Sequence, residues 1–151
     1  MGITRDTAPD ERTYRPSPPS AEQLRSVTAG FDLRLIVLFG SSARGRARQD
    51  SDLDVGVFAK HPLSATQRTD LWGRLSQLLQ AEVDLTVLNH VEPLLGYQVA
   101  RDGVVLFEAE PQVWENWKSY AVRRYWDTHK YRDALKDYLA RRAEEMRRAS
   151  A

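Results

Sequence analysis

The 151-residue chain contains no cysteine. This absence excludes disulfide frameworks, thiolate nucleophiles, zinc ribbons and thiol redox chemistry, and it favours an intracellular setting. The chain also has no long apolar run, because its longest uninterrupted aliphatic and aromatic stretch is Leu35 to Phe39. That stretch is far shorter than a membrane span, and no apolar segment follows the initiator methionine. We therefore expect a cytoplasmic protein without a membrane anchor or signal peptide.

Net charge is also nearly absent, since 22 Lys and Arg face 21 Asp and Glu. The charge is divided unevenly along the chain: residues 1–110 carry 12 basic and 15 acidic residues, whereas residues 111–151 carry 10 and 6. The hydrophobic fraction of 42% is enough to bury a core at this length. These features predict one folded domain with a basic C-terminal quarter.

The pattern of prolines, caps and apolar residues predicts an α/β (α+β) fold with a small, mostly antiparallel or mixed sheet of about four strands. Residues 1–19 hold four of the seven prolines and predict an irregular arm. Residues 20–110 form the predicted core, with strands near 33–39, 53–57, 83–87 and 104–107 and helices that begin after Ser20, after Ser64 and at Pro93. Residues 111–151 predict a helical segment of the same domain, as one long helix or as two with a bend near Asp127 and Thr128.

Apolar side chains on two predicted helices indicate which faces pack on the sheet. Between His61 and Val83, the apolar positions at helical spacing are Leu71, Trp72, Leu75, Leu78 and Leu79. In the C-terminal segment they are Trp114, Trp117, Ala121, Tyr125, Leu135, Tyr138 and Met146. Among these, Trp114, Trp117 and Tyr125 are expected to pack in the core. Trp126, Lys130 and Tyr131 fall off this stripe and indicate either a partner surface or a wide amphipathic face.

Two aspartates in the second predicted strand are candidates for chemistry. Asp52 and Asp54 lie two residues apart, so both carboxylates project from one sheet face while Leu53 and Val55 enter the core. Two close anions repel each other unless a cation lies between them. Oxygen ligands without nearby histidine or cysteine favour Mg²⁺, or Mn²⁺, over zinc.

Further candidate residues lie before and after this pair. Gly40 and Ser41 end the first predicted strand, where a glycine lets the backbone approach a phosphate and the following groups donate to its oxygens. A third carboxylate opens the next strand, and the alternation places both Glu82 and Asp84 on a suitable face without choosing between them. Three carboxylates with two divalent ions are typical of nucleotidyl and phosphoryl transfer.

The order strand, Gly40-Ser41, ten residues and Asp52-Leu53-Asp54 resembles the signature of the DNA polymerase beta-like nucleotidyltransferase superfamily. The resemblance covers the minimal core, residues 31–108. It implies that Gly40 and Ser41 hold the triphosphate of ATP, that Asp52 and Asp54 bind two Mg²⁺ ions, and that Asp84 is the third metal-binding and catalytic carboxylate. The segments Ala43-Arg44-Gly45 and Asp50-Ser51-Asp52 also resemble those of small prokaryotic members of the superfamily. This resemblance adds Arg44 and Ser51 as nucleotide-binding candidates.

The chain length restricts which subfamily of the superfamily is expected, because about 40 residues after the fourth strand are too few for a separate RNA-binding or helical domain. The chain is similar to the minimal nucleotidyltransferases called MntA, antitoxins paired with a HEPN-domain toxin. This implies transfer of AMP from ATP to a tyrosine of the toxin, which silences its RNase activity, with the long C-terminal helix as a docking surface. Two alternatives stay open: a small-molecule acceptor of the aminoglycoside type, and a non-catalytic antitoxin that sequesters its toxin. Direct nucleic-acid binding is not expected, because Glu144 and Glu145 interrupt the basic C-terminus.

Overall fold

The computed structural model describes residues 18–43 and 52–151. The predicted N-terminal arm therefore lies almost wholly outside the described residues. In chain order the elements are α1 (Ala21–Thr28), β1 (Leu33–Phe39), α2 (Gly40–Ala43), β2 (Leu53–Ala59), α3 (Ala65–Leu79), β3 (Val83–Val87), the 3-10 turn η1 (Leu88–His90), α4 (Pro93–Asp102), β4 (Val104–Glu108), α5 (Val113–Asp127) and α6 (His129–Ala149).

The predicted mixed sheet is confirmed, and its strand order is β3-β2-β1-β4. The central strand β1 pairs antiparallel with both β2 and β4. The pair formed by β2 and β3 is parallel, so a crossover must connect them, and helix α3 provides it. This parallel pair matters for the site because it brings the starts of β2 and β3 to the same end of the sheet.

Short polar side chains determine where the helices begin, as the sequence predicts. Ser20 and Ser64 each form a capping box, in which the serine Oγ accepts from the backbone N–H of the residue three positions later. The side-chain oxygen of that residue, Gln23 or Gln67, in turn accepts a hydrogen bond from the backbone N–H of the serine. Pro93 occupies the start of α4, where its missing N–H is not needed.

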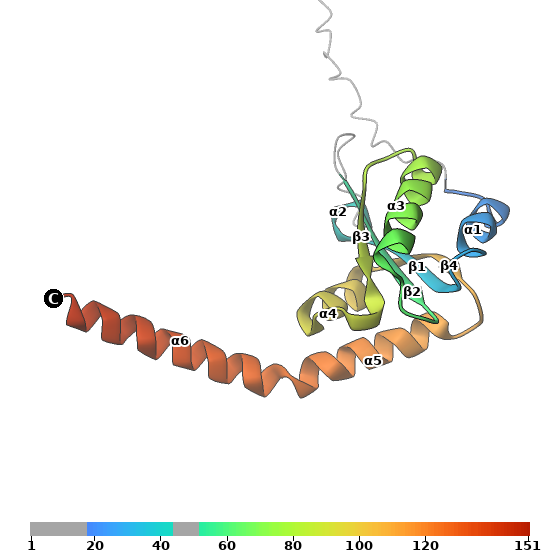
Figure 1. Ribbon diagram of the computed structural model, residues 1–151. Helices are drawn as coiled ribbons and strands as arrows, with labels where there is room; N and C mark the ends of the chain where they lie inside the picture. The colour runs from blue at the N-terminus through green and yellow to red at the C-terminus, as the bar shows by residue number, and fades with distance from the viewer. Residues whose placement is uncertain (1–17, 44–51) are drawn as a thin grey trace, which may run out of the picture.

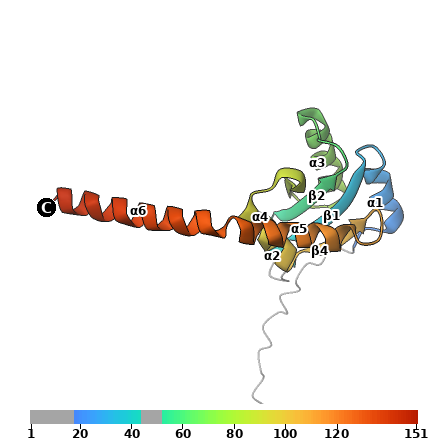
Figure 2. The ribbon, with the colours of Figure 1, turned by 90° about the horizontal axis from the view of Figure 1, so that it is seen from below.

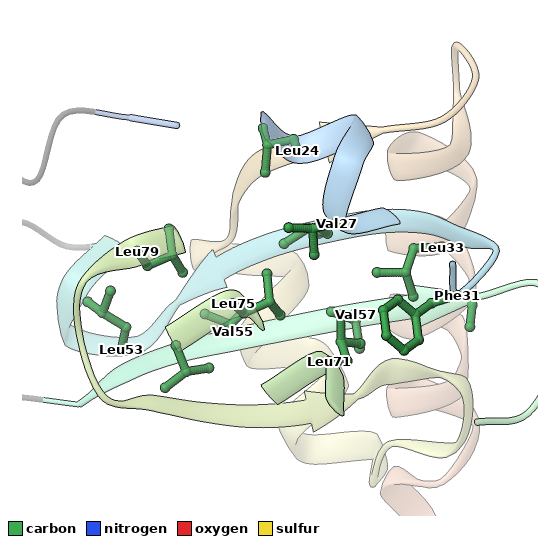
Figure 3. Packing of buried hydrophobic residues seen from close by; sticks show 13 residues of the cluster. Leu24, Val27, Phe31, Leu33, Leu53, Val55, Val57, Leu71, Leu75 and Leu79 are labelled. Carbon is green, nitrogen blue, oxygen red and sulfur yellow. The ribbon is translucent and has the colours of Figure 1, made fainter. Parts of the chain in front are cut away.

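Helices cover both faces of the sheet. On one face, α1 and α3 pack against apolar side chains of β1, β2 and β3, and Figure 3 shows this cluster from close by. On the other face, α4 and α5 pack on a second cluster centred on Leu35 and Val37 of β1. Burial at about 25 cal/mol per Å² on both faces stabilises the sheet. The layers α1/α3, sheet and α4/α5 are visible in Figure 1.

The prediction that Trp72 packs within the apolar face of α3 is wrong. Its side chain is 44% exposed, whereas Leu71 and Leu75 are fully buried. The indole lies at the border of the helix face, where its Nε1 donates to the carbonyl oxygen of Val83 at 2.8 Å. Trp72 therefore covers part of the outer side of β3 instead of entering the core.

The C-terminal segment forms two helices that meet at Thr128, in agreement with the predicted bend. The Arg132 guanidinium holds this junction, because it donates to Thr128 Oγ1 at 2.6 Å and to the Tyr125 carbonyl oxygen at 2.7 Å. The guanidinium carbon Cζ of Arg132 lies 3.9 Å from the centre of the Tyr125 ring, and this ring stacks on Tyr97 of α4. The start of α6 is thus tied to the body of the protein.

Beyond this junction, α6 extends away from the sheet, as Figures 1 and 2 show in two orthogonal views. It contains no buried residue. Its large exposed side chains are Tyr131, Leu135, Tyr138, Leu139 and Met146. Tyr138, which the helical spacing places on the apolar stripe, is therefore exposed, because the helix runs past the end of the sheet (Figure 1). Trp117, which is expected in the core, is buried. In residues 18–43 and 52–151, we find no helix with the length and hydropathy needed to cross a membrane.

Candidate active site

The candidate carboxylates lie at one end of the parallel strand pair. Asp54 of β2 is paired in register with Asp84 of β3. Paired residues of neighbouring strands carry their side chains on the same face, so both carboxylates project from the sheet side by side. Asp52 directly precedes β2 instead of lying within it, which corrects the expectation that both aspartates belong to the strand. The structure thus brings acids from two separate segments together.

The electrostatics of Asp54 show that these acids interact. Burial of the carboxyl group raises the pKa of Asp54, and the negative charges of Asp84 and Asp52 raise it further. Glu82 does not contribute to this shift. Of the two acids that the alternation left open, Asp84 is therefore the one whose charge acts on Asp54.

Gly40 lies against the same carboxylate from the side of β1. Its φ of +70° falls in the left-handed region that favours glycine. A Cβ atom added at Gly40 would overlap the carboxylate of Asp54. The position therefore requires glycine for two reasons. Ser41 is the next residue of the short helix α2 and is exposed.

The donor set fits a hard divalent cation in type. Asp52, Asp54 and Asp84 offer carboxylate oxygens only, which Mg²⁺ and Mn²⁺ prefer. Burial and repulsion by Asp84 and Asp52 raise the pKa of Asp54, and a cation between the carboxylates would offset both effects. In the described part of the chain, however, no group of three or more His, Asp or Glu side chains is gathered closely enough to hold a metal by itself. In proteins Mg²⁺ is commonly held by few carboxylates together with the phosphates of the substrate.

Two predicted nucleotide-binding residues, Arg44 and Ser51, lie outside the described residues. The structure adds a feature that sequence reasoning missed, a groove of about 830 Å³ along the outer side of β3 that includes Asp84. Trp72 and Arg68 of α3 line it as well. The only sequence signal for this groove is the tryptophan at the edge of an otherwise aliphatic helix face.

An α/β sheet with a left-handed glycine after one strand and in-register carboxylates on the next two defines a nucleotidyltransferase of the polymerase beta class. The model of the family described as polymerase beta nucleotidyltransferase matches residues 22–112, from α1 to the start of α5. The chain belongs to this family.

Three relatives show where in the family the chain lies. It is 34% identical to the protein adenylyltransferase MntA of Aphanizomenon flos-aquae over 95 residues, which are 56% of this chain and 63% of that protein. The match thus spans less than two thirds of this curated relative. A chain in the crystal structure of a toxin–antitoxin with AMP-PNP superposes with a TM-score of 0.68 at 27% identity, covering 79% of this chain and 97% of the other.

A third relative comes from the structure of a tri-AMPylated Shewanella oneidensis HEPN toxin in complex with MNT antitoxin. It superposes with a TM-score of 0.62 at 28% identity and covers 79% of this chain and 91% of the other. Toxin–antitoxin structures are therefore among the relatives in fold as well as in sequence.

Proposed function

We propose that this chain is an antitoxin that transfers AMP from ATP to a tyrosine hydroxyl of a cognate HEPN-family toxin and thereby silences the toxin's RNase activity. The observation that carries the proposal is the pairing of Asp54 with Asp84 beside Gly40. The likeness to MntA and to toxin–antitoxin structures supports the acceptor and the partner.

The proposed reaction is an in-line displacement at the α-phosphorus of ATP. The phenol oxygen of the tyrosine forms a bond to this phosphorus and loses its proton, while the bond to the bridging oxygen of the β-phosphate breaks. The products are an AMP–tyrosine ester, pyrophosphate and a proton. Such a step needs position and charge more than covalent chemistry from the protein.

The residues divide this work between the two substrates. The backbone at Gly40 and the hydroxyl of Ser41 orient the terminal phosphates, and Arg44 and Ser51 are proposed to assist them. Asp52, Asp54 and Asp84 would hold Mg²⁺, which when bound neutralises the phosphates and lowers the pKa of the acceptor hydroxyl. Asp84, on the strand farthest from Gly40, faces the acceptor.

Helix α6 supports the partner in this proposal. Its large apolar side chains are exposed, with Tyr131 at 77% and Leu135 at 55%. A contiguous exposed apolar patch is typical of a protein interaction site. We propose that residues 20–110 hold the nucleotide site and residues 111–151 the toxin-docking surface of one domain, acting in the cytoplasm where ATP is supplied.

The first prediction tests the chemistry directly. The chain is mixed with the HEPN-type protein encoded by its neighbouring reading frame and with ATP labelled at the α-phosphate. We expect label on a tyrosine of that protein, and a roughly hundredfold or larger loss of labelling in Asp52→Asn, because the metal-binding charge is removed. Mass spectrometry of the partner locates the added AMP.

Asp70→Asn is the matched control, since Asp70 is an exposed aspartate of α3 that pairs with Arg74 at 3.2 Å. It should label the partner at the wild-type rate. Wild-type labelling by Asp52→Asn would exclude this site. Neutralisation of the toxin without any AMP would favour sequestration, and label on an added aminoglycoside in place of the protein would favour a small-molecule acceptor.

A further inference from the structure

The outer side of β3 is a sheet edge that adjoins the candidate site. The strand order leaves β3 with a neighbour, β2, on one side only. On its other side runs the groove of about 830 Å³, with the first turns of α3 as its opposite wall. Asp84 lines this groove and also belongs to the carboxylate pair. The groove and the site of AMP transfer are therefore continuous.

The backbone of β3 presents hydrogen-bonding groups to the groove. The Leu53 N–H donates to the Glu82 carbonyl oxygen at 2.8 Å, so the peptide groups of Glu82 point toward β2. In a parallel ladder these directions alternate, and Val83 and Leu85 therefore point outward. The carbonyl of Val83 is bonded by the Trp72 indole. No described residue bonds the outward N–H and C=O of Leu85.

The order of the strands also assigns the two substrates to opposite sides. Gly40, at the end of β1, touches Asp54 from one side, and the β3 edge lies on the other side of the pair. In an in-line displacement the entering oxygen and the leaving oxygen lie on opposite sides of the phosphorus. If pyrophosphate leaves toward Gly40, the acceptor must enter from β3.

We infer that an extended segment of the protein substrate adds to β3 as a further strand and carries the acceptor tyrosine to Asp84. This inference rests on the proposed function. A residue that pairs with Leu85 would lie on the α3 face of the sheet, and its neighbours in the segment would lie on the carboxylate face. A tyrosine at such a neighbouring position stands next to Asp84, about one strand spacing of 5 Å away.

The walls of the groove suit such a segment. Side chains directed to the α3 face would meet the exposed part of Trp72 and the aliphatic stem of Arg68. The backbone of the segment would satisfy the peptide groups of Leu85, which supplies affinity without demanding a particular sequence. Trp72 already covers Val83, so strand addition begins beyond the first residue of β3.

The second prediction concerns protection of this edge in the complex. Asp52→Asn chain, ATP and the HEPN-type partner are combined, and amide hydrogen exchange is compared with that of the free chain. We expect the Leu85 amide to exchange roughly tenfold or more slowly in the complex, because it gains a hydrogen bond. The amide groups of β4, the other sheet edge, are the internal comparison and should not change.

A pair of substitutions tests the same edge by kinetics. Leu85→Pro removes an outward N–H and no bond to β2, whereas Leu85→Val shortens the side chain and keeps the N–H. We expect Leu85→Pro to raise KM for the partner about tenfold relative to Leu85→Val, the effect of one lost peptide hydrogen bond. KM for ATP should be equal in the two variants. Circular dichroism checks that both variants are folded. The hydrogen-exchange experiment uses neither Leu85 variant, so it tests the inference even if one of them fails to fold.

Several outcomes would overturn the inference. Wild-type AMP transfer without protection of Leu85, or equal KM values in the two variants, would reject strand addition and leave the proposed function intact. An absence of AMP transfer by the wild-type chain would reject both. Protection already present in the free chain would mean another occupant: a second copy if it depends on concentration, or residues 1–17 if it vanishes when they are deleted.

Discussion

Helices α5 and α6 follow one another in the chain and both carry aromatic and aliphatic side chains, yet they lie in opposite environments. Helix α5 buries Val113, Trp117 and Ala121 against the sheet and α4. Helix α6 buries nothing. Composition differs, because α6 is the more polar helix and carries more charged side chains than α5. Position differs as well, since α5 crosses a face of the sheet and α6 continues past it (Figure 1).

This comparison teaches that apolar periodicity identifies a helix and its faces but not what those faces meet. An amphipathic helix is stabilised by a surface that receives its apolar side. For α5 that surface is part of the same chain. For α6 the described residues provide none, and the proposed toxin would.

The largest expected effect separates the two helices by stability. Trp117 is 5% exposed, so Trp117→Ala should lower the free energy of unfolding by about 3–5 kcal/mol through the cavity it leaves. Leu135→Ala on α6 should change it by less than about 0.5 kcal/mol, as is usual for exposed positions. Urea denaturation measures both.

The same α6 variant should behave differently toward the partner. If α6 docks the toxin, Leu135→Ala weakens binding by about 1–2 kcal/mol, a loss that calorimetry of the complex detects. A large loss of stability in Leu135→Ala would show that α6 packs on the body in solution, and the contrast with α5 would then disappear.

A smaller effect compares two glycines, one in the site and one outside it. Gly40→Ala must hold an alanine at φ +70° and push the Asp54 carboxylate aside. We expect a stability loss of roughly 1–3 kcal/mol and reduced AMP transfer. Gly73→Ala, in the interior of α3 with nothing near its Cβ, should stabilise by about 0.5–1 kcal/mol.

Thermal denaturation and the labelling assay distinguish these outcomes. Normal transfer by a destabilised Gly40→Ala would confine the role of this glycine to folding. Equal changes in the free energy of unfolding for Gly40→Ala and Gly73→Ala would mean that the close approach of Gly40 to Asp54 does not contribute to stability.

The smallest expected effect concerns the repulsion among the carboxylates. Because the pKa of Asp54 is raised above its ordinary value of 3.8, the unfolded chain loses this proton first as pH rises. The free energy of unfolding therefore decreases as pH rises from the ordinary pKa of 3.8 through the higher pKa of Asp54 in the folded chain. Asp54→Asn should remove this loss and stabilise the metal-free chain near neutral pH by about 0.5 kcal/mol, a figure reduced for solvent screening.

The measurement is the difference in unfolding free energy between Asp54→Asn and wild type across acid and neutral pH, without Mg²⁺. The difference should grow with pH and then level off. Asp70→Asn, which breaks the pair with Arg74, should show no such gain. A destabilised Asp54→Asn at neutral pH would contradict repulsion at this site.

Much of the fold follows from local patterns. The dense apolar run of β1 and the two capping boxes identify strands and helix starts, because each depends on neighbours a few residues away. The spacing from Gly40 to Asp54 predicts which residues belong to the site, since few residues separate the end of one strand from the start of the next. The roles of these residues remain predictions.

Other features depend on contacts between distant segments, and no local pattern shows them. The alternation leaves Glu82 and Asp84 equivalent, and only the pairing of β3 with β2 relates Asp84 to Asp54. Likewise, Trp72 follows the spacing of a buried residue, but the width of α3's contact with the sheet leaves it at the edge of β3.

The sequence by itself determined the class of fold and the helix and strand boundaries to within a few residues, because hydrophobic period, caps and glycine act locally. It also predicted a set of nucleotide-binding residues, and their roles stay predictions. The tertiary structure decided that Asp84 lies in register with Asp54 and that β3 is an edge of the sheet. It also decided that the described residues offer no surface to the apolar side of α6. These properties depend on strand order and on how far each helix reaches, and both are set by the free energy of the whole packed chain.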